Sequence, residues 1–217
     1  MEGLVMWYGQ KSVYQEKFKD PLGKFFTEEN FPELKTNKDD VSCILQKAID
    51  DLVKEQQYGI IYIPEGEYPI KRTILIPPSV RLIGYGKKRP AFVLPPYTKG
   101  FDGINKDETM PRASEQDSFP NAAYMFWFIG NKDTKTLKPQ DANAGTFYSA
   151  ISNIDFRIKE GNPYAICIKA HFAQHGFVSH CHFDLGDGLA AFFDVCRQRA
   201  RQRVSYLPTR RHGGGVK

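Results

Sequence analysis

Three short apolar runs, each closed by proline or glycine, dominate residues 59–86 and restrict what this chain can fold into. The runs cover residues 60–63, 73–76 and 80–83. Their β-branched residues favour a pleated strand, Pro64 and Pro77 cannot lie inside a strand ladder, and Gly84 gives the backbone freedom at a corner. No helix of ordinary length fits between these breaks. We therefore predict short strands joined by tight corners.

An amphipathic helix is predicted immediately before these strands. Residues 41–52 carry apolar side chains at helical spacing, namely Ile44, Leu45, Ala48, Ile49 and Leu52. Asp39 and Asp40 are candidate N-caps, and Gly59 follows a few residues after the expected end. The helix should thus run directly into the strands.

Three motifs follow one another in fixed order within residues 38–95. They are Leu-Gln-Lys-Ala-Ile-Asp in the helix, Ile-Pro-Glu-Gly-Glu-Tyr at the first corner, and Val-Arg-Leu-Ile-Gly-Tyr-Gly after it. In order and spacing, this segment resembles the start of the pectate-lyase-like proteins, and most nearly the β-1,3-glucanase type of glycoside hydrolase family 55. The resemblance implies a mainly β fold, a right-handed parallel β-helix (solenoid) whose N-terminal end is capped by the helix.

An internal repeat in residues 147–195 supports the same fold. Residues 151–158 align with 178–185 at an offset of 27, which matches Phe156 with Phe183, and residues 165–169 align with 190–194 at an offset of 25. A period in the twenties with short strands is typical of stacked coils about 4.8 Å apart. The strands of residues 59–86 are predicted to form the first coil. Because similar proteins continue with further coils, the resemblance implies a β-helix truncated at its C-terminal end.

Further strands are predicted at residues 91–94 and 124–129, the second buried on both faces. Two long polar excursions, residues 97–123 and 130–145, leave the corners. In similar proteins such excursions commonly form the walls of a substrate groove, although an insertion without a role has the same appearance.

The positive charge is concentrated at the end of the chain. The net charge is +5, but residues 196–217 hold seven of the 30 Lys and Arg and none of the 25 Asp and Glu, so residues 1–195 carry −2. We divide the chain into an N-terminal extension (1–37), a partial pectate-lyase-like β-helix (38–195) and a basic tail (196–217). The tail is interpreted as disordered or as the product of a frameshift. The alternative is an arginine-rich arm for RNA or anionic surfaces; no nucleic-acid partner is predicted.

The cysteine positions and the hydropathy of the chain add little about its partners or localisation. Cys43, Cys167, Cys181 and Cys196 show no Cys-x-x-Cys spacing and are predicted to be buried thiols, with a Cys167–Cys181 bridge as the alternative. No apolar run approaches the roughly 20 residues that span a bilayer, and the N-terminus has no secretory signal pattern. No membrane partner is predicted, and localisation stays open, although similar proteins are typically secreted or in the cell envelope.

The densest polar cluster lies near residue 180. His180, His182 and Asp184 are two residues apart, so on one strand they would share a face. Asp155 is the repeat equivalent of His182, one coil away. These four residues are the candidates for lining a carbohydrate groove, and an ordinary solvated face is the alternative. No metal site and no cofactor are predicted.

No catalytic residue can be assigned. Glycoside hydrolysis needs a carboxylic acid and a second carboxylate or activated water, and in similar glucanases the catalytic acid lies in later coils. A lyase would need clustered Asp for calcium, and none accompanies Arg157 or Lys169.

Two functional hypotheses remain. The first is the N-terminal part of a carbohydrate-active hydrolase or lyase that binds polysaccharide and is inactive as this fragment. The second is a non-catalytic glycan-binding or structural module, for which Trp127, Tyr97 and Phe101 are candidate sugar-stacking platforms if exposed. In either case an uncovered last coil would favour self-association.

Overall fold

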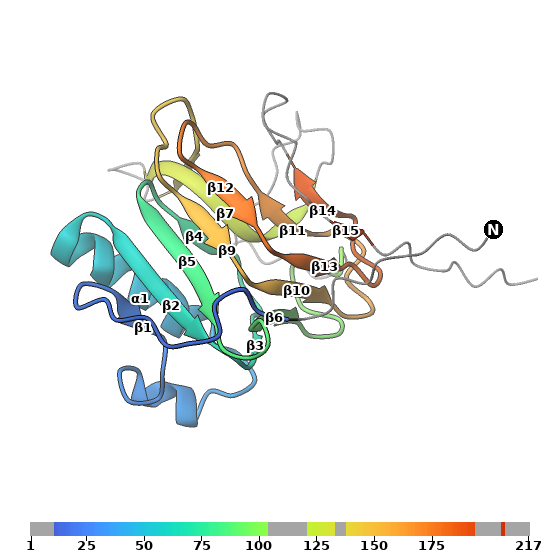
Figure 1. Ribbon diagram of the computed structural model, residues 1–217. Helices are drawn as coiled ribbons and strands as arrows, with labels where there is room; N and C mark the ends of the chain where they lie inside the picture. The colour runs from blue at the N-terminus through green and yellow to red at the C-terminus, as the bar shows by residue number, and fades with distance from the viewer. Residues whose placement is uncertain (1–10, 104–120, 133–137, 194–204, 207–217) are drawn as a thin grey trace, which may run out of the picture.

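The computed structural model describes residues 11–103, 121–132, 138–193 and 205–206, which are mainly β with one α-helix (Figure 1). The helices are η1 (Pro32–Lys35, 3-10) and α1 (Ser42–Gln56). The strands are β1 (Lys24–Phe25), β2 (Gly59–Pro64), β3 (Glu67–Pro69), β4 (Ile74–Ile76), β5 (Val80–Tyr85), β6 (Ala91–Leu94), β7 (Ala123–Lys132), β8 (Pro139–Asp141), β9 (Ala150–Ser152), β10 (Asp155–Ile158), β11 (Ala165–Lys169), β12 (Phe177–Ser179), β13 (His182–Asp184), β14 (Ala190–Phe193) and β15 (Ser205–Tyr206).

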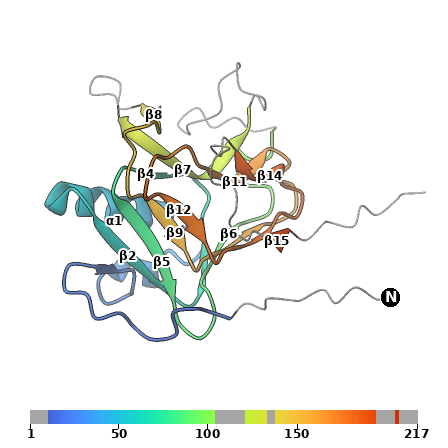
Figure 2. The same cartoon turned by 45° about the horizontal axis from the view of Figure 1, so that its top comes forward.

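The strands form three parallel sheets. Sheet 1 has the order β1-β2-β5-β9-β12, sheet 2 the order β3-β6-β10-β13-β15, and sheet 3 the order β4-β7-β11-β14, while β8 pairs antiparallel with β7. Within the described residues, the chain visits the three sheets in the same order four times, and we name these passages coil 1 (β2–β4), coil 2 (β5–β7), coil 3 (β9–β11) and coil 4 (β12–β14). Figures 1 and 2 show β2, β5, β9 and β12 side by side. This arrangement is consistent with a pectate-lyase-like β-helix.

The predicted strands of residues 59–86 are present as β2, β4 and β5, but their grouping into one coil is wrong. Strand β5 pairs with β2, with Ile60 opposite Arg81, so β5 begins coil 2. Coil 1 is completed by β3, which sequence reasoning missed because Glu67–Pro69 is short and not apolar. Strands β6 and β7 lie where they were predicted, and β7 is buried on both faces from Tyr124 to Ile129.

The predicted offset is confirmed for the first half of the repeat and is wrong by one residue for the second half. Phe156 lies opposite Phe183, which is the predicted offset of 27. Ile168 lies opposite Phe192, so the second offset is 24 and not 25. The corner between β13 and β14 is shorter than the one between β10 and β11, and it turns tightly at Gly186 (φ 48°). A shift of one residue exchanges the two faces of a strand, so Phe192, and not Phe193, packs on the core.

Helix α1 buries all five predicted apolar side chains and contacts β2 and β4. Its side chain Gln46 accepts a hydrogen bond from the Leu75 N–H (2.8 Å). The predicted N-caps are wrong, because Val41 occupies the N-cap position. Asp40 instead accepts a hydrogen bond from the Ser42 N–H in the first turn (3.0 Å), which satisfies one of the helix's orphan donors.

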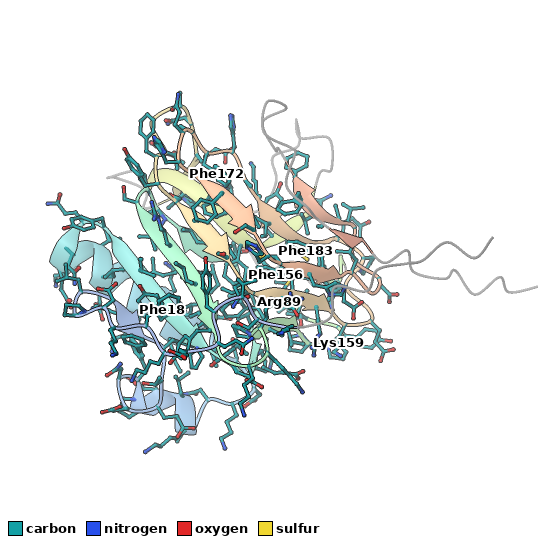
Figure 3. All side chains as sticks on the ribbon, viewed as in Figure 1. Phe18, Arg89, Phe156, Lys159, Phe172 and Phe183 are labelled. Atoms are coloured by element: carbon teal, nitrogen blue, oxygen red, sulfur yellow. The ribbon has the colours of Figure 1, made fainter. Side chains whose placement is uncertain are left out.

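An aromatic ladder runs through the interior along sheet 2. The register places Tyr68, Phe92, Phe156 and Phe183 opposite one another on β3, β6, β10 and β13. Successive ring centroids lie 5.8, 6.3 and 5.1 Å apart, and Figure 3 shows Phe156 beside Phe183. We name these four residues the inner ladder. Burial raises the pKa of the Tyr68 hydroxyl, so this ring stays neutral inside the stack.

The cysteine prediction is confirmed for two residues and wrong for one. Cys167 and Cys181 are buried and free, and burial raises the pKa of the Cys181 thiol to about 12. Cys43 is exposed because it lies on the outward face of α1. Cys196 lies outside the described residues. So do most of the tail predicted at 196–217 and parts of both excursions (104–120 and 133–137). The division into three segments stays a prediction.

Candidate functional site

Asp155, predicted to face the groove, is 2% exposed and bound inside the protein. Its Oδ1 accepts hydrogen bonds from Arg89 Nε (2.5 Å) and from the backbone N–H of His182 (3.1 Å). Arg89 is itself almost covered, and it is labelled in Figure 3. A desolvated ion pair of this kind holds coils together but leaves its carboxylate little access to a ligand.

The prediction that His180 shares a strand face with His182 is wrong. His180 lies at the bend between β12 and β13 with φ 54°, and β13 begins only at His182. Asn153 has the equivalent conformation one coil earlier (φ 59°), and its buried side chain donates to the Gly84 carbonyl (2.8 Å). The period-two pattern therefore breaks at a corner that is present in both coil 3 and coil 4.

Asp184 is exposed and His182 is half-buried on the outer face of sheet 2. Asp184 lies opposite Arg157, whose guanidinium is paired with Glu67. Within the part of the chain that the structure describes, no three His, Cys, Asp or Glu side chains gather as a metal site. The structure thus places Asp155, His182 and Asp184 on the neighbouring strands β10 and β13, while His180 lies at the bend before β13. A role for these residues in a groove remains a prediction.

Two of the three proposed aromatic platforms are buried. Phe101 is in the core, and Trp127 is almost fully covered and donates from Nε1 to Asp141 Oδ1 (2.8 Å). Tyr97 is 69% exposed, and its ring covers Gly161, where a β-carbon would lie 2.3 Å from Cδ1. Of these three predicted platforms, only Tyr97 therefore offers a ring to a ligand.

Sequence reasoning missed a charged network on the outer face of sheet 3. Lys169 is 4% exposed, and its Nζ lies 3.0 Å from Asp141 Oδ2 and 4.5 Å from the centre of the Trp127 ring. The rings of Tyr124 and Phe193 complete the surroundings of this ammonium group. Such cation–π contacts stabilise a desolvated lysine. Because the network joins residues of four strands, β7, β8, β11 and β14, no local motif reveals it.

An open groove of about 390 Å³ lies on the outer face of sheet 1, a size in the range of ligand sites. Its lining residues are Asp20, Leu22, Gln56, Tyr58, Gly59, Ile60, Ser79, Arg81 and Tyr148. Tyr58 is 57% exposed and Tyr148 is 48% exposed. Exposed aromatic rings beside a guanidinium group suit a ligand with both apolar faces and polar substituents.

Arg81 is held in place at the floor of this groove. Its Nε donates to the Tyr148 carbonyl (2.9 Å), and its guanidinium carbon lies 5.9 Å from the centre of the Phe177 ring. Nε accounts for one of the five N–H donors of the guanidinium group, so further donors and a positive charge remain for a ligand.

The N-terminal segment forms one wall of the groove. Phe18 and Phe25 stack on Tyr62 of β2, with centroid distances of 4.4 and 5.0 Å, and Figure 3 shows Phe18 over sheet 1. The Tyr62 hydroxyl donates to Asp20 Oδ2 (3.0 Å). Burial, together with this bond, raises the pKa of Tyr62 to about 12. Asp20 is thereby fixed at the rim.

These parallel sheets, with one outer face hollowed into a groove, define a pectate-lyase-like domain. The family model described as rhamnogalacturonase A/epimerase, pectate lyase-like, matches residues 34–193, and the chain belongs to this family. Comparison with curated proteins and with solved structures found no match. Nearness to glycoside hydrolase family 55 therefore stays a prediction.

The length and hydropathy of the helices bear on whether one of them could cross a membrane. Within the described ranges, no helix is long and apolar enough to cross a membrane.

Proposed function

We propose that this chain is the N-terminal part of a carbohydrate-active β-helix protein and that it binds polysaccharide in the groove on sheet 1. The observation that carries the proposal is the open groove with two half-exposed tyrosines and Arg81, in a chain of the pectate-lyase-like family. Aromatic rings offer flat apolar surfaces to sugar rings, and Arg81 offers charge-assisted hydrogen bonds to carboxylates. An acidic polysaccharide such as polygalacturonate or rhamnogalacturonan is therefore favoured over a neutral glucan.

The fold belonging to this proposal is a right-handed solenoid capped by α1. Support comes from the parallel strands, which visit three sheets in constant order, because crossover connections between parallel strands are nearly always right-handed. Helix α1 covers the apolar side of β2 and β4 at the first coil, as a cap would. Strands β12 and β14 end sheets 1 and 3 within the described residues, and open edges of this kind favour self-association.

We further propose that the fragment binds without turnover. The predicted carboxylate pair does not offer two solvent-facing groups, because Asp155 is buried in its ion pair with Arg89 while Asp184 is exposed. Hydrolysis needs two carboxyl groups that reach the same bond. The alternative is a non-catalytic glycan-binding or structural module even in a longer protein.

The test is binding of the full 217-residue chain to polygalacturonate, rhamnogalacturonan I and the β-1,3-glucan laminarin. Affinity electrophoresis should show retardation by the acidic polysaccharides, and Arg81→Ala should reduce it. Release of reducing ends or unsaturated sugars should be absent over hours. If none of the three polymers retards the chain, the proposal fails, and any turnover contradicts the claim of inactivity. Preference for laminarin would overturn the role of Arg81 and favour the glucanase resemblance.

A further inference from the structure

A corner precedes the sheet 1 strand of each of the four coils, and one position of this corner is equivalent from coil to coil. Ile60 lies opposite Arg81, Arg81 opposite Ala150, and Ala150 opposite Phe177. Two residues before each of these positions, ahead of the strand itself, lie Tyr58, Ser79, Tyr148 and His175. We name these four residues the corner ladder.

The backbone of the corner ladder is nearly constant over three coils. Ser79, Tyr148 and His175 have φ values of 62°, 63° and 62°, all in the left-handed region that bulky residues seldom adopt. The corner thus accepts serine, tyrosine or histidine in the same conformation. What differs between the coils is the volume of the side chain.

Ser79 leaves a slot between two aromatic side chains. Neighbouring parallel strands lie about 4.8 Å apart, so Tyr58 and Tyr148, which are two strands apart, are separated by about 10 Å along the stack. Tyr58, Ser79 and Tyr148 all line the groove described above. Between the two tyrosines, the ladder has only a hydroxymethyl group.

His175 supports one wall of this slot. Its ring stacks on the Tyr148 ring, with centroids 5.0 Å apart and an angle of 7° between the planes. One face of Tyr148 is therefore covered by His175, and Tyr148 lines the groove together with Ser79. Stacking limits the rotation of the exposed tyrosine, so less conformational entropy is lost when a ligand binds.

We propose that the slot over Ser79 is a carbohydrate subsite that takes one pyranose ring between Tyr58 and Tyr148. This inference rests on the proposed function, since it assigns a place in the same groove. A ring held against Tyr148 has its apolar C–H face pointing along the stack. The sugar chain therefore leaves the slot across the stack, in the direction of the strands, with Arg81 beneath its polar substituents. His175 is a positioning residue that acts through Tyr148.

The test fills the slot. In Ser79→Tyr, the new tyrosine needs the backbone conformation that Tyr148 already adopts at φ 63°, so the fold should be retained while the space is lost. We expect calorimetric titration with hexagalacturonate to show roughly tenfold weaker binding, the size of one lost aromatic contact. Ser79→Ala, which keeps the slot open, is the matched control and should bind as the unaltered chain does.

A second substitution, at His175, distinguishes a positioning role of this residue from direct contact with the sugar. His175→Ala should weaken binding of the hexamer by a smaller factor and leave the melting temperature unchanged, and His175→Phe should restore the affinity because it can also stack. If Ser79→Tyr fails to fold, Tyr58→Ala removes the opposite wall and should weaken binding similarly. Unchanged affinity in Ser79→Tyr, or in Tyr58→Ala, overturns the subsite but leaves the proposed function standing. Absence of binding by the unaltered chain contradicts the proposed function itself.

Discussion

The inner ladder on sheet 2 and the corner ladder beside sheet 1 each repeat once per coil but have opposite properties. In the inner ladder, Tyr68, Phe92, Phe156 and Phe183 place an aromatic ring on every coil, and each of the three Phe rings is fully or almost fully covered. In the corner ladder, an aromatic ring is missing at Ser79, and the neighbouring tyrosines are half exposed. The ladder that faces the interior is filled in every coil, whereas the ladder at the surface leaves a space at one coil.

The difference shows how a repeated fold can carry a local site. The strand register determines only which side chains of successive coils are neighbours. An unbroken aromatic series buries apolar area and stabilises the stack. A single small residue in an exposed series interrupts the packing and creates a space of defined width.

The largest expected loss of stability comes from a substitution in the inner ladder. Phe156→Ala removes a fully buried ring that stacks on Phe183 at 5.1 Å, so the free energy of unfolding should fall by about 3–5 kcal/mol. Chemical denaturation measures this change. Phe156→Leu, which retains most of the volume, should cost clearly less. A loss below about 1 kcal/mol for the alanine variant would mean that the stack is not a packed core.

The buried ion pair should give the next largest effect. Asp155→Asn keeps the shape of the side chain but leaves the charge of Arg89 without its partner in a nearly covered position, which should destabilise the protein by about 3 kcal/mol. Polysaccharide binding should be unchanged once the variant is folded. Asp184→Asn, at an exposed position, is the control for stability. If Asp155→Asn abolished binding without loss of stability, Asp155 would be a groove residue after all.

The corner ladder should respond in the opposite manner. Tyr148→Ala removes a half-exposed ring from the groove, so affinity for polygalacturonate should fall by about 1 kcal/mol, or roughly fivefold, with little change in unfolding. Tyr164→Ala removes another exposed tyrosine, which covers Gly103 outside the groove, and should leave affinity unaltered. Equal effects of the two substitutions would remove the distinction between the groove and the rest of the surface.

The smallest expected effect is the loss, at alkaline pH, of the stability that Tyr62 contributes in the wall of the groove. The pKa of Tyr62 is raised to about 12 by burial and by Asp20, compared with about 10 in an unfolded chain. Its contribution to stability is therefore present below pH 10 and is lost as the pH rises through 12. Tyr62→Phe should be less stable by about 1 kcal/mol at pH 7, and the difference should shrink between pH 10 and 12. Thermal melts measure this, with exposed Tyr14→Phe as the control; a constant difference would contradict the raised pKa.

Much of the fold could be predicted from the sequence because its signals are local. Apolar runs closed by proline and glycine gave the strands, helical spacing gave α1, and the first repeat offset gave the pairing of Phe156 with Phe183. The second offset was wrong by one residue because the length of the Gly-containing corner after β13 could not be inferred from apolar spacing. Strand β3 was missed because its residues are not apolar.

The candidate site was less predictable, since its parts come from distant segments. Asp155 and His182 were correctly placed on neighbouring coils, but only the fold shows that Arg89 takes up the Asp155 carboxylate. The groove joins Asp20, Tyr58, Arg81 and Tyr148 from four parts of the chain. The strand register that relates Tyr58 to Tyr148 is known only from the fold, and Asp20 lies outside the coils.

The sequence by itself determined a helix followed by short strands, because residue type and periodicity act within a few residues of one another. The order of its motifs added the resemblance to the pectate-lyase-like proteins. Only the tertiary structure decided which residues face a ligand. Exposure depends on what every other segment covers: the N-terminal segment covers Tyr62 but leaves Arg81 and Tyr148 open. The contrast between a filled ladder and an interrupted one exists only once the coils are placed side by side.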